Sequence, residues 1–240
     1  MTGLEQRSEV ERAKRLMAMG QMAASLAHEI RNPLGSMELY CTLLKKDLAA
    51  LPESLQLADQ IHSGIRRLER IISNCLQFSR DLIPRRVPNV DTRQVLEDCV
   101  ELARAKGGAS KVAIRIEERG SAPISVDPHL VSQAVLNLLL NALEALEQAS
   151  VPFPEISVQS ERRPNGDWAI AITDNGPGIP EIHRESIFDP FVTTKRDGTG
   201  LGLAIVHSIV TAHGGTVQVE EGPRGGASIH LVFPTEADNG

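Results

Sequence analysis

Three polar side chains in the stretch "LAHEIRNPLGS", residues 26–36, could together carry out phosphoryl chemistry. With about 100° between successive residues of a helix, His28 and Asn32 lie on one outward face and Glu29 lies beside them. A neutral imidazole nitrogen is a competent nucleophile, and an adjacent carboxylate can hold the other ring N–H. Pro33 removes a helix hydrogen bond and favours a bend one turn after the histidine. The pattern predicts an exposed, reactive histidine, although a lone surface histidine is more often only solvated.

A second polar group lies on a helix expected at 128–148, within the stretch "VLNLLLNALEA". Asn137, Asn141 and Glu144 fall on one side of this helix, opposite a broad apolar arc. If the apolar arc is buried, the two amides face a cleft, where their oxygens could bind a hard cation such as Mg²⁺. Taken alone, the two residues could equally be surface asparagines.

Two glycine-rich stretches follow further along the chain. "DNGPGIP" begins with Asp174 at the end of an expected strand, where a carboxylate can accept a hydrogen bond from an exocyclic amine such as that of adenine. Gly176 and Gly178 would let the backbone approach the base closely. "GTGLGLA" opens an expected helix at 201–215, whose free N–H groups can receive phosphates. Each stretch alone is a weak signal, because most such stretches are ordinary turns.

The elements that must position these residues form two halves with different periods. Helical periodicity runs over 8–51 and again over 54–82, beyond the turn "LPES", which predicts an antiparallel hairpin. A lone hairpin cannot cover the apolar stripes of both helices, so we expect two copies to form a four-helix bundle. "LIPRRVPNVDT" has the composition of a linker. We therefore expect a hairpin domain at 1–83, a linker at 84–90 and a second domain at 91–240.

In the second domain, helices and strands alternate along the chain. Interleaved elements of this kind predict an α/β layer sandwich, so the expected fold class is α+β with two domains. The expected helices span 92–105, 128–148 and 201–215, and the expected strands span 111–118, 155–163, 168–174, 216–221 and 227–234.

The composition excludes several classes of function. A net charge of −6 over 240 residues argues against a nucleic-acid binder and against binding to an anionic membrane. No apolar run reaches the roughly 18 positions of a membrane span, so we expect no span and a cytoplasmic location. Cys41, Cys75 and Cys99 are widely spaced, which predicts neither disulfides nor a zinc site. His213 and the histidines other than His28 lack supporting neighbours, and we interpret them as structural.

Together, these motifs resemble those of the sensor histidine kinases of two-component systems. "HEIRNPL" is similar to the phosphoacceptor motif of that family. The asparagine helix, "DNGPGIP", "IFDPFVTTK" and "GTGLGLA" resemble, in the same order, the asparagine, first glycine, phenylalanine and second glycine boxes of the Bergerat ATPase domain, which gyrase and a class of heat-shock chaperones share. The resemblance covers roughly residues 15–234. It implies a dimeric four-helix bundle followed by a Bergerat-type α/β sandwich.

The resemblance also implies a role for individual residues. His28 would receive the γ-phosphoryl group of ATP, Glu29 would assist as base, and Asn32 would help a water attack the phosphorylated partner. Asp174 would read adenine, and Asn141, with Asn137, would hold Mg²⁺. The other residues implied at the nucleotide are Gly176, Gly178, Ile179, Phe188, Phe191, Thr194, Lys195, Gly198, Thr199, Gly200, Leu201 and Gly202.

Residues 179–198 would then form a mobile lid, which Phe188 and Phe191 pack down and from which Lys195 reaches a phosphate. Glu144 departs from the family pattern, because many members carry a basic residue at this position. This departure makes Lys195 the expected cation at the phosphates.

The implied reaction passes the phosphoryl group from His28 to an aspartate of a response-regulator receiver domain. The expected partners are therefore a second copy of the chain and a receiver domain. Residues 1–15 look like the end of a signalling helix, so an upstream sensor domain or subunit is also expected. Two alternatives remain open: a nucleotide-gated scaffold that binds ATP only to change shape, and a serine kinase of the anti-sigma type, against which the long hairpin counts. The sequence does not choose between a kinase and a phosphatase bias.

Overall fold

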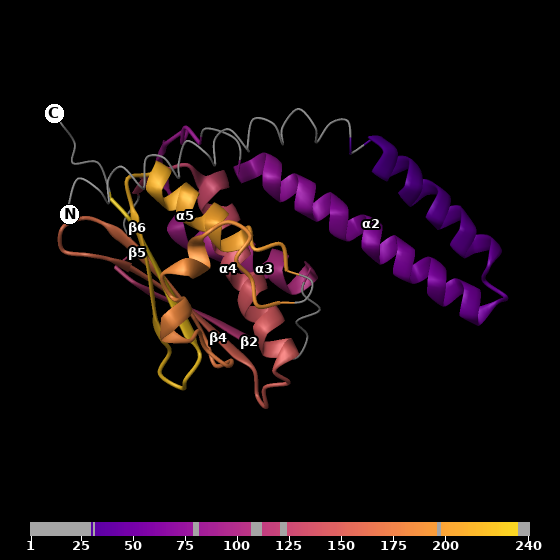
Figure 1. Ribbon diagram of the computed structural model, residues 1–240. Helices are drawn as coiled ribbons and strands as arrows, with labels where there is room; N and C mark the ends of the chain where they lie inside the picture. The colour runs from indigo at the N-terminus through magenta and orange to yellow at the C-terminus, as the bar shows by residue number, and fades with distance from the viewer. Residues whose placement is uncertain are drawn as a thin grey trace. The chain divides into compact units, whose positions relative to one another are not determined.

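The computed structural model describes residues 30, 32–78, 82–106, 112–120, 124–195 and 198–234 (Figure 1). The chain divides into two compact units, which are Met1–Asp81 with Thr193–Leu201, and Leu82–Val192 with Gly202–Gly240. The predicted hairpin belongs to the first unit and the predicted α/β domain to the second.

The first unit contains an antiparallel helical hairpin, as predicted. The described part of its first helix continues to residue 47, and α2 spans Pro52–Phe78. The N–H of Leu51 donates to the carbonyl of Leu48 (2.8 Å) and closes the turn between the helices. α2 begins two residues earlier than expected, because proline, with its fixed φ and missing N–H, suits the first position of a helix.

A thin apolar core joins the two helices. Leu34, Cys41 and Ile65 are buried, and Ile72 packs against them. The thiol of Cys41 donates to the carbonyl of Ala58 at 3.1 Å. Cys41 is therefore a buried, hydrogen-bonded thiol, in agreement with the absence of a disulfide or zinc pattern in the sequence.

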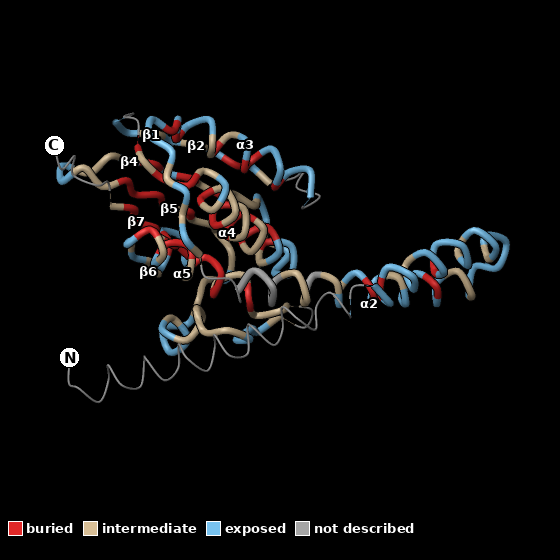
Figure 2. Tube along the Cα trace, turned by 90° about the horizontal axis from the view of Figure 1, so that it is seen from above, coloured by how far each residue is buried: buried red, intermediate tan, exposed pale blue. Residues whose placement is uncertain are grey.

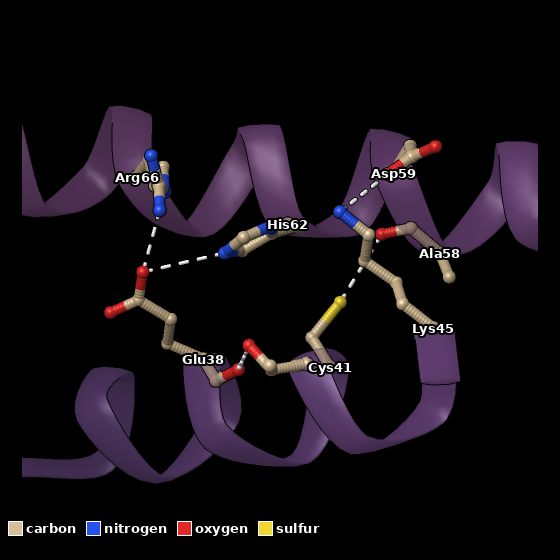
Figure 3. A network of polar contacts seen from close by, with 8 residues as sticks. Glu38, Cys41, Lys45, Ala58, Asp59, His62 and Arg66 are labelled. Carbon is tan, nitrogen blue, oxygen red and sulfur yellow. Dashed lines mark hydrogen bonds and ion pairs between the residues drawn. The ribbon is translucent and has the colours of Figure 1, made fainter. Parts of the chain in front are cut away.

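Polar contacts fix the register of the hairpin on either side of this core (Figure 3). The Glu38 carboxylate lies 3.3 Å from His62 Nε2 and accepts from Arg66 Nε, also at 3.3 Å. Nearer the turn, Lys45 Nζ lies 2.7 Å from the Asp59 carboxylate. These side chains are partly exposed, so the contacts specify how the helices align more than they stabilise the hairpin.

Many apolar side chains of the hairpin face away from its core, and Figure 2 shows both helices as mostly exposed. On α2, Leu57, Ile61 and Leu68 recur at helical spacing and are each at least 50% exposed. The hairpin therefore presents a second apolar surface that a single chain leaves in water. The exposed large apolar residues of the hairpin are Ile30, Met37, Leu39, Tyr40, Leu43, Leu44, Leu51, Leu57, Ile61 and Leu68.

The second unit is a five-stranded sheet with helices on one face (Figure 1). The strand order is β2-β4-β5-β7-β6; β2 and β4 are parallel, and the other neighbours are antiparallel. This architecture is the predicted α/β sandwich. The elements are α3 (Thr92–Lys106), β2 (Ala113–Arg119), α4 (Pro128–Gln148), β4 (Glu155–Arg162), β5 (Trp168–Asp174), α5 (Gly202–Ala212), β6 (Thr216–Glu221) and β7 (Ala227–Phe233).

α4 is the central helix of this domain and has the predicted bounds. The Asp127 carboxylate caps it by accepting the N–H groups of His129 and Leu130, and Pro128 occupies its first turn. Eight of its residues are buried, and it packs against β5, α3 and α5. Within the described ranges, α4 is the one helix long and apolar enough to cross a membrane. Its packing identifies it as the core helix of the domain.

The predicted linker at 84–90 is wrong in its second half. β1, Val87–Val90, pairs antiparallel with β3, Ile124–Val126, a short strand that the sequence pattern did not predict. Pro88 cannot donate to a sheet ladder, but a two-stranded ribbon leaves edge positions where no donor is needed. The strand Val87–Val90 contains a proline and an asparagine, which are typical of linkers. This composition explains why the sequence pattern predicted a linker here.

Two arginines before β1 fasten the chain to the domain. The guanidinium of Arg86 donates to the carbonyls of His213 (2.7 Å) and Ser125 (3.4 Å). The backbone N–H of Arg85 donates to the Asp127 carboxylate (2.9 Å), the same group that caps α4. The backbone is therefore held to the domain from Arg85 onward.

His213, just after α5, is buried and has both ring nitrogens hydrogen-bonded. Nδ1 lies 2.8 Å from the carbonyl of Ile209, and Nε2 lies 3.1 Å from the N–H of Asp127. Because a carbonyl only accepts and an amide N–H only donates, the ring must be neutral with its proton on Nδ1. Burial lowers the pKa of His213 below its usual value, which agrees with this form. The structural role predicted for His213 is confirmed.

We expect the domain to lose stability in mild acid through His213. Its lowered folded-state pKa means that the unfolded chain binds the extra proton first. Neutral His213 therefore makes its whole contribution to the free energy of unfolding above about pH 6.5, and the free energy of unfolding decreases as the pH drops below that value. Urea unfolding of the full chain, followed by fluorescence of the single, buried Trp168, should show this decline. His213→Gln should cost about 1–3 kcal/mol at pH 7.5 and flatten the decline. Equal pH slopes in both proteins would contradict the prediction.

Candidate functional site

Asn137 and Asn141 lie one turn apart on α4 and meet the first residue of α5. Asn137 Nδ2 donates to the carbonyl of Gly202 at 3.5 Å. A Cβ at Gly202 would lie 3.6 Å from Asn141 Nδ2 and 3.8 Å from its Oδ1, which is ordinary contact distance. The structure thus brings the asparagine helix together with the end of the second glycine-rich stretch. Glu144, one turn further along α4, is exposed.

Asp174 ends β5, and backbone groups orient its carboxylate. Oδ1 accepts the N–H of Gly176 (2.8 Å) and the N–H of Ala227 (3.3 Å). A Cβ at Gly176 would lie 2.8 Å from that oxygen and 3.6 Å from Leu146 Cδ2 on α4. The loop after β5 therefore lies against the same helix that carries the two asparagines, and only glycine fits at 176 without a shift.

Gly178 needs the conformational freedom of glycine. Its φ is +73°, and a Cβ would lie 2.5 Å from the carbonyl oxygen of Gly225 in the turn between β6 and β7. The next residue, Ile179, accepts a hydrogen bond on its carbonyl from Arg184 Nε (3.1 Å). The loop that begins at Asp174 is thus fixed at both of its ends.

Asn175 belongs to the same motif but holds the neighbouring loop instead. Its Oδ1 accepts the N–H of Glu155 (2.8 Å), and its Nδ2 donates to the carbonyl of Phe153 (3.0 Å). Sequence reasoning gave this residue no role. A side-chain clamp on a segment twenty residues away leaves no local signal in the chain.

The first half of the predicted lid has regular local structure, with η1 at Glu181–His183 and η2 at Ser186–Phe188. Phe188 packs on His207 of α5, with ring centroids 5.8 Å apart. Phe191 is 54% exposed and has a φ of +67°. The expectation that both phenylalanines pack the lid down therefore agrees with the contact of Phe188 and is wrong for Phe191, which is exposed.

The second half of the lid contains a tight turn around Lys195. The N–H of Lys195 donates to Thr193 Oγ1 (3.1 Å), and its carbonyl accepts the N–H of Gly198 (3.3 Å). A Cβ at Gly198 would collide with the Thr193 side chain, which explains the glycine at this position. Thr194, the remaining predicted contact in this turn, is exposed.

Three predicted phosphate neighbours lead from this turn into α5. Thr199 Oγ1 accepts the N–H of Leu201 at 3.3 Å. Gly200 has a φ of +66°, which favours glycine, and Leu201 is buried. α5 itself begins at Gly202, one residue later than expected.

Of the predicted phosphoacceptor residues, only Asn32 is described. It is helical and exposed, as the helical wheel predicts. His28 and Glu29 lie outside the described residues, and their roles stay predictions.

Comparison with known proteins agrees with this geometry. A family model of the histidine kinase-, DNA gyrase B- and HSP90-like ATPases matches residues 125–237, and a model of the His Kinase A phosphoacceptor domain matches residues 18–81. The sensor histidine kinase ZraS of Escherichia coli O157:H7 is 36% identical over 227 residues, which cover 94% of this chain. This chain spans 48% of the length of ZraS, about half of that relative.

Solved histidine kinases resemble the chain in part or over its whole length. The mycobacterial sensor histidine kinase MprB aligns with a TM-score of 0.55 and 30% identity, covering 62% of this chain and 98% of that one. The histidine kinase ThkA, in complex with the response regulator protein TrrA, aligns with a TM-score of 0.69 and 26% identity, covering 100% of this chain and 69% of that one.

The fold and the site define an ATPase domain of the Bergerat type, preceded by a helical hairpin of the phosphoacceptor type. The chain belongs to the sensor histidine kinases of two-component systems and carries their catalytic core.

We expect Asn141→Ala to weaken Mg²⁺-dependent ATP binding at least tenfold, because the variant removes an amide oxygen from the predicted cation site. Asn141 is only partly buried, so the free energy of unfolding should change little. Titration calorimetry with a non-hydrolysable ATP analogue, with and without Mg²⁺, measures the effect. Gln148→Ala, at an exposed position on the same helix, is the control. Wild-type affinity in Asn141→Ala would refute the assignment.

Proposed function

We propose that the protein is an ATP-dependent protein-histidine autokinase that phosphorylates its own His28. The observation that carries this proposal is the meeting of Asn137 and Asn141 with Gly202 at the start of α5. It puts two amide side chains and a helix N-terminus, which suit a cation and phosphates respectively, at one place. The family of the chain and its "HEIRNPL" motif support the choice of acceptor.

In the proposed step, a neutral ring nitrogen of His28 attacks the γ-phosphorus of ATP. The N–P bond forms as the bond from phosphorus to the β,γ-bridging oxygen breaks, and ADP leaves with that electron pair. Glu29 would hold the other ring N–H and stabilise the cationic phosphohistidine. Lys195 would neutralise phosphate charge. Catalysis would come mainly from this positioning and charge neutralisation.

The residues on α4 fit a magnesium ion bound together with the nucleotide. Among the residues that the structure describes, no group of three or more His, Cys, Asp or Glu side chains could hold a metal alone. The amide oxygens of Asn141 and Asn137 are hard ligands, and Mg²⁺ typically completes its shell with phosphate oxygens and water. When bound, the ion would supply charge neutralisation at the γ-phosphate.

We expect incubation with γ-labelled ATP and Mg²⁺ to give an acid-labile, alkali-stable label on the protein. His28→Gln should abolish the label, because the variant removes the proposed acceptor nitrogen. His62→Gln, which alters another histidine of the hairpin, should keep it. A wild type that binds ATP but takes up no label would support the nucleotide-gated scaffold instead. A label retained in His28→Gln would contradict the assignment of His28 as the phosphoacceptor.

We propose that the phosphoryl group then passes to an aspartate of a response-regulator receiver domain. The N–P bond of phosphohistidine breaks as the carboxylate oxygen bonds to phosphorus. The ring nitrogen keeps the electron pair of that bond, so the histidine returns to its neutral form with its other N–H still in place. Asn32 is exposed on the first helix. In the proposal it would orient a water for the later hydrolysis of the aspartyl phosphate, so a phosphatase activity is included.

We propose further that the hairpin at residues 1–83 pairs with a second copy of itself. The apolar residues that it exposes, including Leu57, Ile61 and Leu68, support a bundle in which a partner hairpin covers them. The segment that precedes Arg85 would connect the hairpin to the ATPase domain, which holds the chain from that residue onward. Both domains would lie in the cytoplasm, where ATP is present, under the control of an upstream sensor domain or subunit.

Ile61→Glu should weaken self-association at least tenfold, because it places a charge in the proposed interface. Sedimentation equilibrium of the full chain measures this change. Leu102→Glu alters an apolar residue that is similarly exposed, but on α3 of the other domain, and should leave association unchanged. Equal effects of the two variants, or a wild-type chain that is monomeric at micromolar concentration, would overturn the proposed bundle.

A further inference from the structure

The turn between β6 and β7, residues 222–226, closes on the end of β5. Within the turn, the N–H of Gly225 donates to the carbonyl of Gly222 (2.9 Å). The N–H of Gly222 in turn donates to the carbonyl of Gly226 (2.7 Å). A Cβ at Gly226 would collide with the carbonyl oxygen of Asp174 and lie 2.7 Å from its carbonyl carbon. Both atoms are backbone atoms of a central strand and cannot move aside, so only glycine allows this approach.

The approach has a direct effect on the Asp174 side chain. Because position 226 has no side chain, the next residue, Ala227, brings its N–H to 3.3 Å from Asp174 Oδ1. The N–H of Gly176 also donates a hydrogen bond to this oxygen, at 2.8 Å. Two backbone donors from opposite sides of the loop therefore fix the rotation of this carboxylate.

One ion pair fastens the turn to the sheet. Arg224 donates to Glu155 Oε2 at 2.8 Å. Glu155 is itself held in place, because its other carboxylate oxygen lies 3.3 Å from Arg115 on β2 and its N–H donates to Asn175. Arg224 thus ties the turn to a residue anchored on β4.

We propose that this turn is a specificity element of the nucleotide site, in which Gly226 and Arg224 are positioning residues for Asp174. A carboxylate only accepts hydrogen bonds, so its correct rotation favours a purine that carries an exocyclic amine. The inference rests on the proposed function, in which Asp174 faces the base. Phosphate binding at α5 does not depend on the turn, so disturbing the turn selectively removes the preference for the amine.

The test compares ATP with purine riboside triphosphate, which lacks the 6-amino group, by titration against the full chain. The wild type should bind ATP at least tenfold more tightly than the analogue, and Asp174→Asn should remove that difference. Gly226→Ala should weaken ATP binding about tenfold, as expected when one charge-assisted hydrogen bond is lost. Arg224→Gln should weaken it about threefold, since an exposed ion pair contributes less. Neither turn variant should change affinity for the analogue more than twofold.

The matched control is Arg93→Gln, which removes another exposed 2.8 Å arginine–glutamate pair, on α3, and should leave both affinities unchanged. The autokinase KM for ATP should rise in the turn variants while kcat stays within twofold of the wild type.

If the affinities for ATP and for the analogue fall together, the turn is merely structural and the inference is overturned. If Gly226→Ala does not fold, Arg224→Gln decides: retention of full discrimination by this variant overturns the inference. A wild type that binds ATP and the analogue equally would instead show that the assignment of Asp174 in the proposed function is at fault.

Discussion

The ATPase domain depends on the two-sided character of α4. One side of this helix supplies eight buried residues to the core and packs against β5, α3 and α5. The other side carries Asn137 and Asn141, which cannot enter that core without losing hydrogen bonds to water. Burial of the apolar side therefore dictates where the amides point. The asparagine positions follow from the same packing that holds the sheet and helices together, so the site and the core share one constraint.

The hairpin follows a different rule. Its internal core consists of a few residues around Cys41 and Ile65, and polar pairs such as Lys45–Asp59 set the register along its length. Helices with so little shared core gain most of their stability from whatever covers their remaining apolar surface. The ATPase domain buries its own apolar side chains, whereas the hairpin leaves many exposed. The two units thus differ in how much of their apolar surface is buried within a single chain.

Periodicity predicted the long elements well: α4 buries one side and repeats at 3.6 residues, and β4 alternates with a period of two. β5 and β7 are buried on both faces and appear in the sequence as continuous apolar runs. Periodicity failed at β1 and β3, which are too short to show a period. The family resemblance failed at Phe191, whose backbone conformation no local pattern indicates. The first glycine motif predicted that the backbone approaches a bound base closely, and this stays a prediction. It did not predict the close contacts of the loop with Gly225 and Gly226, because these join positions some fifty residues apart. Roles that arise from a hydrogen bond to a distant loop, such as that of Asn175, likewise required the structure.

The bonds made by Arg85 and Arg86 fix the point at which the chain enters the ATPase domain. Helix α2 ends at Phe78, and the domain holds the backbone from Arg85 onward. The covalent tether between these points is therefore short, about 25 Å even when fully extended. The Asp127 carboxylate that accepts the N–H of Arg85 also caps the first turn of α4. Tension on this short tether would therefore act directly on the start of the helix that carries Asn137 and Asn141.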